Sequence, residues 1–313
     1  MGPKVLVTGA AGFIGFVVVQ ELLRKQVPVV ALDALLDGLY PAQEKIARLE
    51  ILRAHPLVTT VTSDLRSADL GDLPSDISHV VNEAAMPGLG LSWEDFNLYS
   101  SCNTLAVSRL IDVARTWPLE KFVQISTSSV YGKNAVGNED QALRPVSPYG
   151  ITKLAGENLV LAHFEDSGFP ATVLRYFSVY GPGQRPDMAY RKFIHAALHG
   201  EAITLRGSGE QSRSNTFVDD VADATVTALF SSTEGEVFNI SGGEERTINE
   251  ALGIIEELVG HPLEITRVES ARGDQMRTAG DSAKAREILG LKNSVNLEEG
   301  LSRQLAWQQN LGD

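Results

Sequence analysis

One stretch decides the fold of this chain, Lys4-Val5-Leu6-Val7-Thr8-Gly9-Ala10-Ala11-Gly12-Phe13-Ile14-Gly15. Its apolar beginning predicts a β-strand, and its three glycines lead directly into an apolar helix. Glycine lets the backbone turn tightly and approach a pyrophosphate, while the helix N-terminus presents unpaired N–H groups to the anion. The stretch therefore predicts a phosphate cradle, and the implied ligand is a dinucleotide.

The glycine spacing, Gly-x-x-Gly-x-x-Gly, is weak evidence alone, so its context matters. Ile14, Val18 and Leu22 repeat every four positions, as one buried helical face requires. A second apolar run, residues 28–32, ends at Asp33, whose carboxylate can accept hydrogen bonds from the adenosine ribose and repel a 2′-phosphate. We expect NAD rather than NADP. The alternative is a glycine turn that only packs a helix on a strand, with Asp33 in solvent.

Composition limits the classes of function. The 313 residues are 43% hydrophobic and carry a net charge of −13, with no basic stripe, which argues against a nucleic-acid partner. No apolar run approaches the roughly 20 residues of a membrane span, and no charged leader precedes the first strand. The single cysteine, Cys102, excludes an intramolecular disulfide. We expect a cytoplasmic protein without membrane contact.

Strand-like runs alternate with helical patterns through the first half of the chain, at residues 5–7, 29–32, 57–61, 79–81, 122–126 and 172–175. This alternation predicts an α/β fold, a Rossmann-type doubly wound parallel sheet, with ligands beyond the carboxyl ends of its strands. Asp64 and Leu65 follow the third strand, where the adenine is expected. The small residues Ala84 and Ala85 follow the fourth and allow close approach of the cofactor.

The regular alternation breaks after Tyr176. We therefore expect a NAD-binding domain over residues 1–177, and a smaller, mixed and discontinuous substrate region over residues 178–313. The strand-like segment near Val237 suggests that residues 216–240 return to the first domain.

Tyr149 and Lys153 form the centre of the predicted chemistry. Residues four apart share a helix face, so the Lys153 ammonium is expected beside the Tyr149 phenol, lowering its pKa toward that of a general base. Residues 125–132 place hydroxyl groups at the carboxyl end of the fifth strand, within reach of the same substrate oxygen. The alternative is a surface pair on an amphipathic helix.

The chain resembles the extended short-chain dehydrogenase/reductase superfamily, specifically its NAD-dependent nucleotide-sugar epimerases and dehydratases. The matching blocks are residues 7–15, 129–132, 147–149, 174–177 and 185–188. The resemblance implies that Thr127 takes the catalytic Ser/Thr position, that Tyr149 is the base, and that Lys153 tunes it and holds the nicotinamide ribose. It also implies oxidation of the sugar at carbon 4, with the hydride returned later. The expected cofactor contacts are Gly9, Gly12, Phe13, Ile14, Gly15, Asp33, Asp64, Leu65, Ala84, Ala85, Tyr149, Lys153 and Tyr176.

The resemblance also implies substrate contacts, and they are Thr127, Ser128, Ser178, Arg185, Arg213 and Arg272. Arg213 resembles the arginine that grips the nucleotide diphosphate, since a guanidinium fork suits paired phosphate oxygens. Arg272 is a second candidate, although the family arginine more often stands one residue earlier. The alternative for both is a solvated or salt-bridged surface arginine.

Some positions depart from the family pattern. Retaining 4,6-dehydratases carry an Asp-Glu pair where this chain has Ser128 and Ser129, which favours epimerisation over that elimination. Glu83 replaces the usual apolar residue. If it faces the nicotinamide, burial should raise its pKa and poise it to abstract a proton, whereas the alternative reading places it in solvent or in an ion pair. Cys102 is expected to pack near the pocket, with a chemical role as the other possibility.

The leading hypothesis is a 4-epimerase of a UDP-hexose or UDP-N-acetylhexosamine. The alternative is a dehydratase that uses the same carbon 4 ketone, and a remote alternative is a non-catalytic NAD-binding sensor.

His195 and His199 stand four apart on a predicted helix, but we expect no metal because no third ligand is evident nearby. By analogy with relatives that pair two helices into a four-helix bundle, residues 97–116 and 149–166 suggest a homodimer.

Overall fold

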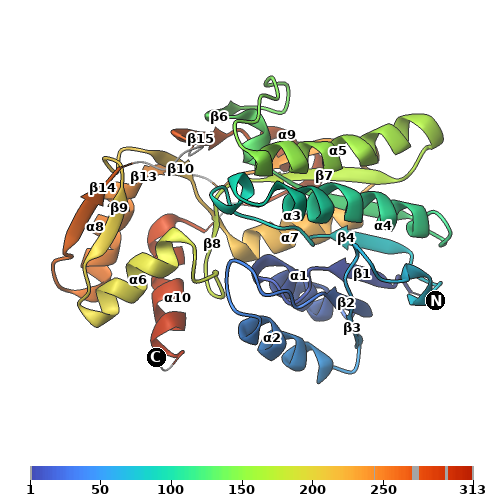
Figure 1. The fold of residues 1–313 in the computed structure, drawn as a ribbon, viewed down its shortest axis with the longest axis horizontal. Helices are drawn as coiled ribbons and strands as arrows, with labels where there is room; N and C mark the ends of the chain where they lie inside the picture. Colours follow the sequence, from blue (N-terminus) through green and yellow to red (C-terminus); the bar gives the residue numbers. More distant parts are fainter. Residues whose placement is uncertain (1, 243, 270–274, 293–294, 312–313) are drawn as a thin grey trace.

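The computed structural model describes residues 2–242, 244–269, 275–292 and 295–311. Within these residues, seven strands form the main sheet: β1 (Val5–Thr8), β2 (Val29–Asp33), β3 (Val58–Thr62), β4 (His79–Asn82), β5 (Lys121–Thr127), β7 (Ala171–Tyr176) and β12 (Val237–Ile240). All neighbours pair in parallel, in the order β12-β7-β5-β4-β1-β2-β3 (Figure 1). The predicted doubly wound sheet is confirmed.

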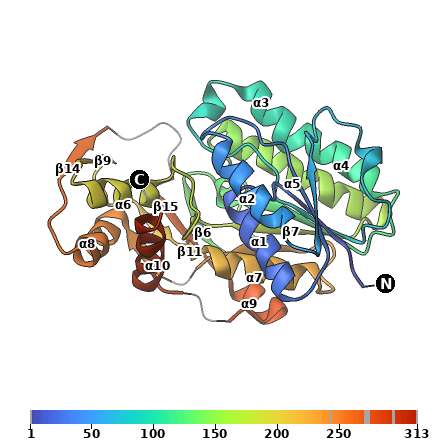
Figure 2. The same cartoon turned by 90° about the horizontal axis from the view of Figure 1, so that it is seen from below.

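Helices cover both faces of the sheet (Figures 1 and 2). One face carries α1 (Phe13–Arg24), α2 (Gln43–Arg53), α7 (Val218–Leu229) and α9 (Ala283–Leu289). The other carries α4 (Ala106–Ala114) and α5 (Pro148–Ser167), and α3 (Phe96–Ser100) lies alongside them. Because helices lie on both sides, the strands are buried on both faces, and this explains their nearly continuous apolar sequences.

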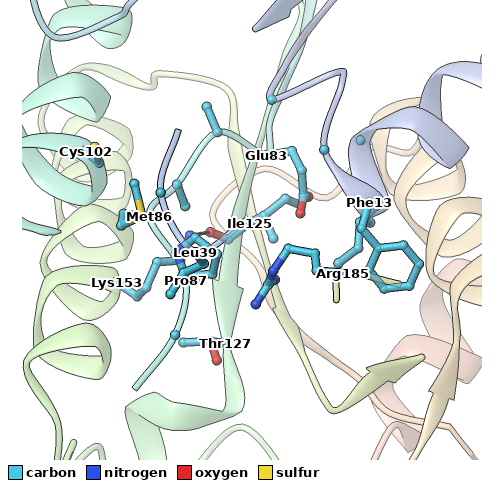
Figure 3. Close-up of a pocket in the computed structure, with 18 of the residues that line it drawn as sticks. Phe13, Leu39, Glu83, Met86, Pro87, Cys102, Ile125, Thr127, Lys153 and Arg185 are labelled. Atoms are coloured by element: carbon cyan, nitrogen blue, oxygen red, sulfur yellow. Dashed lines mark hydrogen bonds between the residues drawn. The ribbon is translucent and has the colours of Figure 1, made fainter. Parts of the chain in front are cut away.

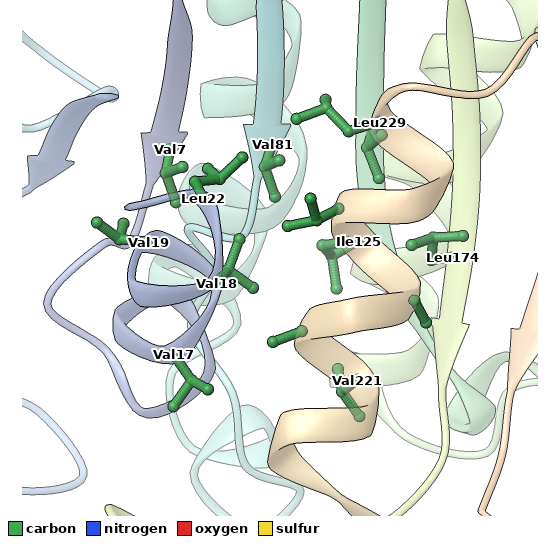
Figure 4. Packing of buried hydrophobic residues seen from close by; sticks show 14 of the residues in the cluster. Val7, Val17, Val18, Val19, Leu22, Val81, Ile125, Leu174, Val221 and Leu229 are labelled. Carbon is green, nitrogen blue, oxygen red and sulfur yellow. The ribbon is translucent and has the colours of Figure 1, made fainter. Parts of the chain in front are cut away.

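The core between the sheet and its first helical layer is built from small branched side chains (Figure 4). Val18 and Leu22 of α1 and Val221 of α7 are fully buried against strand residues such as Val81 and Ile125. Burying each of these side chains stabilises the fold by about 1.5–3 kcal/mol. This packing fixes α1, and with it the glycine loop that precedes the helix.

The strand order reverses direction beside β1. From β1 the chain runs outward to β2 and β3 on one side, then crosses to β4 and continues to β5, β7 and β12 on the other. Loops that leave neighbouring strands in opposite directions open a crevice at the carboxyl ends, which is where open α/β sheets bind ligands.

The start of α5 places Tyr149 in the first helical turn. The Ser147 hydroxyl accepts a hydrogen bond from the Gly150 N–H at 3.1 Å, and Pro148 occupies the first helical position. Both features favour a helix start at this point. At the other end, Gly168 adopts a left-handed conformation with φ of 68°, which terminates the helix.

The remaining elements form a smaller, mixed region beside the sheet (Figure 1). They are β6 (Asn134–Gly137), β8 (Val179–Tyr180), α6 (Ala189–His199), β9 (Ile203–Arg206), β10 (Ser212–Ser214), β11 (Thr216–Phe217), β13 (Glu245–Thr247), α8 (Ile248–Val259), β14 (Ile265–Val268), β15 (Arg277–Gly280) and α10 (Leu297–Gln309). A separate apolar cluster joins α6, α8 and α10. From within this half of the chain, α7 packs on α1, and β12 pairs with β7.

The helix predicted over residues 97–116 is interrupted. A π-helical segment, η3 (Ser101–Leu105), separates α3 from α4. Here Asn103 and Thr104 hydrogen-bond to the side chain and the carbonyl of Thr152 on α5, and the wider turn directs both toward that helix. Short 3-10 turns complete the fold: η1 (Leu70–Asp72), η2 (Leu91–Trp93) and η4 (Ser128–Tyr131). No helix in the described part of the chain is long and apolar enough to span a bilayer.

Candidate active site

A cavity of about 470 Å³ opens at the carboxyl ends of the central strands (Figure 3). It brings together the predicted cofactor contacts and catalytic candidates: Gly9, Gly12, Phe13, Ile14, Gly15, Asp33, Asp64, Leu65, Glu83, Ala84, Ala85, Thr127, Tyr149, Lys153 and Tyr176. Of the other substrate candidates, Ser128, Ser178 and Arg185 line the same cavity. Arg213 does not line it, and Arg272 lies outside the described residues.

The glycine loop fits a pyrophosphate because side chains are excluded from it. A Cβ on Gly15 would stand 2.2 Å from the Gly9 carbonyl oxygen, and a Cβ on Gly9 would stand 2.9 Å from the Ala84 nitrogen. Gly9 also has a positive φ of 66°, which glycine adopts most readily. No side chain caps α1 at Gly12, so the helix N-terminus is open toward an anion.

Asp33 stands at the edge of this loop. Its carboxylate accepts hydrogen bonds from the Ala11 N–H at 3.0 Å and from the Leu35 N–H at 2.8 Å. Beyond the end of β3, the Arg66 guanidinium pairs with Asp64 at 2.7 Å and lowers the pKa of that carboxyl group. Two carboxylates therefore line the side of the cavity that β2 and β3 form, as expected for an adenosine site.

A chain of buried hydrogen bonds runs beneath the cavity from β1 to α5. The Thr8 hydroxyl donates to Asn82 Oδ1 at 2.7 Å, and Asn82 Nδ2 donates to Gln124 Oε1 at 2.8 Å. Gln124 Nε2 then donates to the Ile125 carbonyl at 3.0 Å, and Lys153 Nζ donates to the same oxygen at 2.6 Å. This series of hydrogen bonds fixes the position of the Lys153 amine relative to β1, β4 and β5.

The prediction that Lys153 lowers the pKa of the Tyr149 phenol is wrong in this structure. Burial raises the pKa of the Tyr149 phenol, while a hydrogen bond with Thr127 and the charge of Arg185 act in the opposite direction. Glu83 raises this pKa further. The helical spacing does bring Tyr149 and Lys153 to one cavity, but the amine is held by the Ile125 carbonyl.

Thr127 ends β5 and caps the turn that follows. Its hydroxyl oxygen accepts a hydrogen bond from the Ser129 N–H at 3.2 Å. Directly before it, the Ser126 hydroxyl donates to Glu157 at 2.7 Å, and Glu157 pairs with the buried guanidinium of Arg175. The Ser126 hydrogen bond fastens β5 to α5 and the ion pair fastens α5 to β7, so Thr127 and Tyr149 are held on elements that cannot move independently.

Glu83 faces the cavity, which decides between the two interpretations of this residue (Figure 3). Its Oε2 is buried and has no hydrogen-bond partner among the described residues. Burial raises the pKa of Glu83 to about 8, although the charge of Lys153 opposes the rise. Burial likewise lowers the pKa of Lys153 to about 8, opposed by Glu83 and Glu157.

The substrate candidates are arranged differently from one another. Arg185 forms a two-pronged pair with Asp187, both contacts being 2.9 Å, and lines the cavity. Ser178 lines it with a φ of 26°, a backbone region that residues with side chains rarely adopt. The Arg213 guanidinium instead donates to the Gln275 carbonyl at 2.6 Å.

Sequence reasoning missed Gln275. This buried residue lines the cavity, and its Nε2 donates to the carbonyl groups of Ser128 at 3.2 Å and Gly132 at 2.8 Å. It therefore ties the hydroxyl-rich turn to the C-terminal part of the chain. The available signal was its place three residues after Arg272, in a segment already considered for substrate binding.

Two features weighed in the sequence lie apart from the central chemistry. Cys102 lines the cavity from η3, and burial raises the pKa of its thiol, which lowers its reactivity. His195 and His199 stack with ring centroids 4.2 Å apart. Among the residues that the structure describes, no three His, Cys, Asp or Glu side chains are grouped to hold a metal ion.

Comparisons with known proteins agree with this geometry. The model of the NAD dependent epimerase/dehydratase family matches residues 5–241. A UDP-glucuronic acid 4-epimerase from Bacillus cereus, solved with UDP-glucuronic acid and NAD, superposes with a TM-score of 0.95 at 37% identity, covering 98% of this chain and 99% of its own. An uncharacterized UDP-glucose epimerase of Bacillus subtilis (strain 168), YtcB, is 36% identical over 98% of both chains.

A dTDP-glucose 4,6-dehydratase from Streptomyces venezuelae, DesIV, is also similar, with a TM-score of 0.91 at 28% identity over 99% of this chain and 98% of its own. The chain belongs to the NAD dependent epimerase/dehydratase family. It is an enzyme, and its cofactor is NAD.

Proposed function

We propose that the protein is a UDP-hexose 4-epimerase. The observation that carries this proposal is the convergence of Thr127, Tyr149 and Lys153 on one cavity with the glycine loop. Relatives crystallised with UDP-glucuronic acid and with UDP-glucose support a UDP-linked sugar as the substrate class.

In the proposed reaction, the Tyr149 oxygen takes the proton of the sugar's carbon 4 hydroxyl and later returns it to the same oxygen. Thr127 orients that hydroxyl, and Lys153 fixes the cofactor ribose. Burial keeps the Tyr149 phenol protonated in the protein alone, so an additional positive charge must lower its pKa before it can act as a base. Bound NAD would supply that charge, and its nicotinamide would accept the hydride from carbon 4 of the sugar and later return it.

Epimerisation also requires that the sugar ring can rotate and present its opposite face to the cofactor while the diphosphate stays bound. We assign the diphosphate to Ser178 and to the arginines of the C-terminal region, Arg213 and Arg272. Arg185 lies on the cavity wall close enough for its charge to act on Tyr149. Its guanidinium is paired with Asp187, so it would select a uronic acid among UDP-hexoses by exchanging that partner for the substrate carboxylate.

Elimination is the second candidate function, and Glu83 is the observation that favours it. A carboxylate in the cavity is a potential base for the proton at carbon 5 of a 4-ketosugar. Against it, Ser128 and Ser129 occupy the positions where dehydratases of the family carry an acid and a base. We therefore place epimerisation first.

Proton NMR in deuterated water separates these candidates. UDP-glucose, UDP-glucuronic acid and UDP-N-acetylglucosamine are each incubated with the enzyme. A 4-epimerase produces the corresponding galacto sugar with no deuterium at carbon 5. An alkene, a 6-deoxy signal or deuterium at carbon 5 would establish elimination instead, and three unchanged substrates would contradict the proposed substrate class.

We also propose that residues 1–177 with the returning segment 216–240 form the cofactor domain, and that the rest of residues 178–313 bind substrate. The pairing of β12 with β7 supports this division.

We further propose that the protein is a cytoplasmic homodimer. Exposed Phe96, Leu105 and Ile151 on adjoining helical segments provide an apolar surface for a second copy, and the buried free thiol of Cys102 suits a reducing compartment.

A further inference from the structure

Glu83 is a carboxylate that neither the glycine loop nor the proton transfer at carbon 4 requires. It follows β4, whose last residue, Asn82, is buried and hydrogen-bonds to the side chains of Thr8 and Gln124 on the neighbouring strands. Because successive strand side chains point to opposite faces, the next residue is directed into the cavity (Figure 3). The orientation of Glu83 is therefore set by the buried amide beside it.

Glu83 and Lys153 act on each other's pKa through their charges, but the Lys153 ammonium makes its hydrogen bond elsewhere. The ammonium donates to the Ile125 carbonyl at 2.6 Å, and Oε2 of Glu83 has no hydrogen-bond partner in the described part of the chain. Other groups around it are phenols: the charge of Glu83 raises the pKa of Tyr149 on α5 and of Tyr176 on β7. Burial keeps this carboxyl group protonated near neutral pH in the nucleotide-free protein, and a cation placed beside it would stabilise its ionised form.

The sheet topology places that carboxylate on the nicotinamide side. The glycine loop follows β1, which lies between β2 and β4. Asp33 ends β2, and Glu83 follows β4, so the two carboxylates stand on opposite sides of the pyrophosphate site. A dinucleotide that crosses the loop and directs its adenosine to Asp33 directs its other half to the Glu83 side.

We propose that Glu83 sets the redox preference of the bound cofactor by stabilising oxidised NAD over NADH. This inference rests on the NAD dependence of the enzyme and on the proposed transient oxidation. When the sugar gives up a hydride from carbon 4 and the hydroxyl proton passes to Tyr149, the nicotinamide ring changes from cationic to neutral. A carboxylate beside the ring stabilises the cationic form alone, so it favours the return of the hydride and limits release of a ketosugar.

The test measures binding of NAD and NADH, separately and without sugar, to nucleotide-free protein by isothermal titration calorimetry. Glu83→Gln keeps the shape of the side chain and removes its charge, and we expect the ratio of the NAD dissociation constant to that of NADH to rise about fivefold or more. Glu83→Leu should raise the ratio in the same direction. The matched control is Asp33→Asn, which also removes a cavity carboxylate but should weaken both nucleotides equally.

An unchanged ratio in both Glu83 variants, or equal weakening of the two nucleotides, would overturn the proposal, since a hydrogen bond to the ribose would act on both redox forms alike. Circular dichroism of each variant verifies folding. Because no sugar is present, the result does not depend on whether the enzyme is an epimerase. Conversely, failure of every UDP-sugar in the NMR experiment would leave the measured ratio intact.

Discussion

The ammonium nitrogen of Lys153 lies 2.6 Å from the carbonyl oxygen of Ile125. A backbone carbonyl of β5 therefore anchors the amine, and the same oxygen accepts a hydrogen bond from Gln124. The arrangement holds the amine in place before cofactor binds and leaves the phenol of Tyr149 to be activated by the charges around it.

Tyr149→Phe removes the proposed proton acceptor. Turnover of the UDP-sugar substrate should fall by about 10³-fold, in line with the loss of a general base, while NAD affinity stays close to that of the parent. The measurement is steady-state kinetics together with calorimetric NAD binding. Tyr99→Phe is the matched control, because the Tyr99 ring meets Tyr149 edge-on but its hydroxyl donates to the Pro87 carbonyl. Full activity in Tyr149→Phe would refute the catalytic assignment.

Gly15→Ala tests the phosphate cradle. The added Cβ would stand 2.2 Å from the Gly9 carbonyl oxygen, so the loop must shift. We expect NAD affinity to fall by more than about tenfold and the free energy of unfolding to fall by about 2 kcal/mol or more. In Gly253→Ala the new methyl group meets nothing within 4 Å on α8, and the protein should gain up to about 1 kcal/mol. NAD titration and urea denaturation check both, and unaltered NAD binding in Gly15→Ala would contradict the cradle.

Glu83 makes folding stability depend on pH. Its pKa rises on folding from 4.5 to about 8, so between these pH values the folded protein holds a proton that the unfolded chain has lost. The contribution of Glu83 to the free energy of unfolding therefore decreases as pH rises through this window. The Glu83→Gln variant has no such pH-dependent loss. Between pH 5 and pH 8 its free energy of unfolding should therefore rise by at least about 1 kcal/mol relative to that of the parent.

Urea denaturation of nucleotide-free parent and variant at a series of pH values measures that difference. The same substitution lowers the pKa of Lys153, because it removes the Glu83 charge that raises this pKa. This change also makes the variant more stable relative to the parent as pH rises. A difference between the two proteins that stays constant with pH would show that Glu83 is ionised in the folded state throughout the window.

Leu105→Glu tests the proposed dimer surface. Leu105 is 52% exposed in η3, which packs against α5 beside the exposed Phe96 and Ile151. A buried, unpaired carboxylate at a subunit interface is costly, so the variant should sediment as a monomer at concentrations where the parent is a dimer. Ile51→Glu introduces the same charge at a 61% exposed site on α2 and should leave the mass unchanged. A parent that sediments as a monomer throughout removes the homodimer from the proposal.

Much of the fold and cofactor site could be predicted from the sequence because the relevant signals are local. Gly12 and Gly15 are required by contacts with Gly9 in the same loop, and Asp33 is the last residue of its own strand. Ser147 and Pro148 mark the start of α5, and helical spacing then carries Tyr149 and Lys153 to one face. These relationships depend on neighbours in the chain, so a pattern of residue types is enough to reveal them.

The tertiary structure alone decided which way the unusual groups face and what they touch. Whether Glu83 meets solvent or cofactor depends on the phase of β4 in the sheet, which the partners of Asn82 on β1 and β5 determine. Gln275 reaches Ser128 across 147 positions of sequence. Likewise, the pKa of Tyr149 follows from burial and from charges on other elements rather than from Lys153 one helical turn away. The sequence by itself determined the fold class, the dinucleotide cradle and the identity of the reactive side chains, whereas their electrostatic environment depends on packing between distant segments.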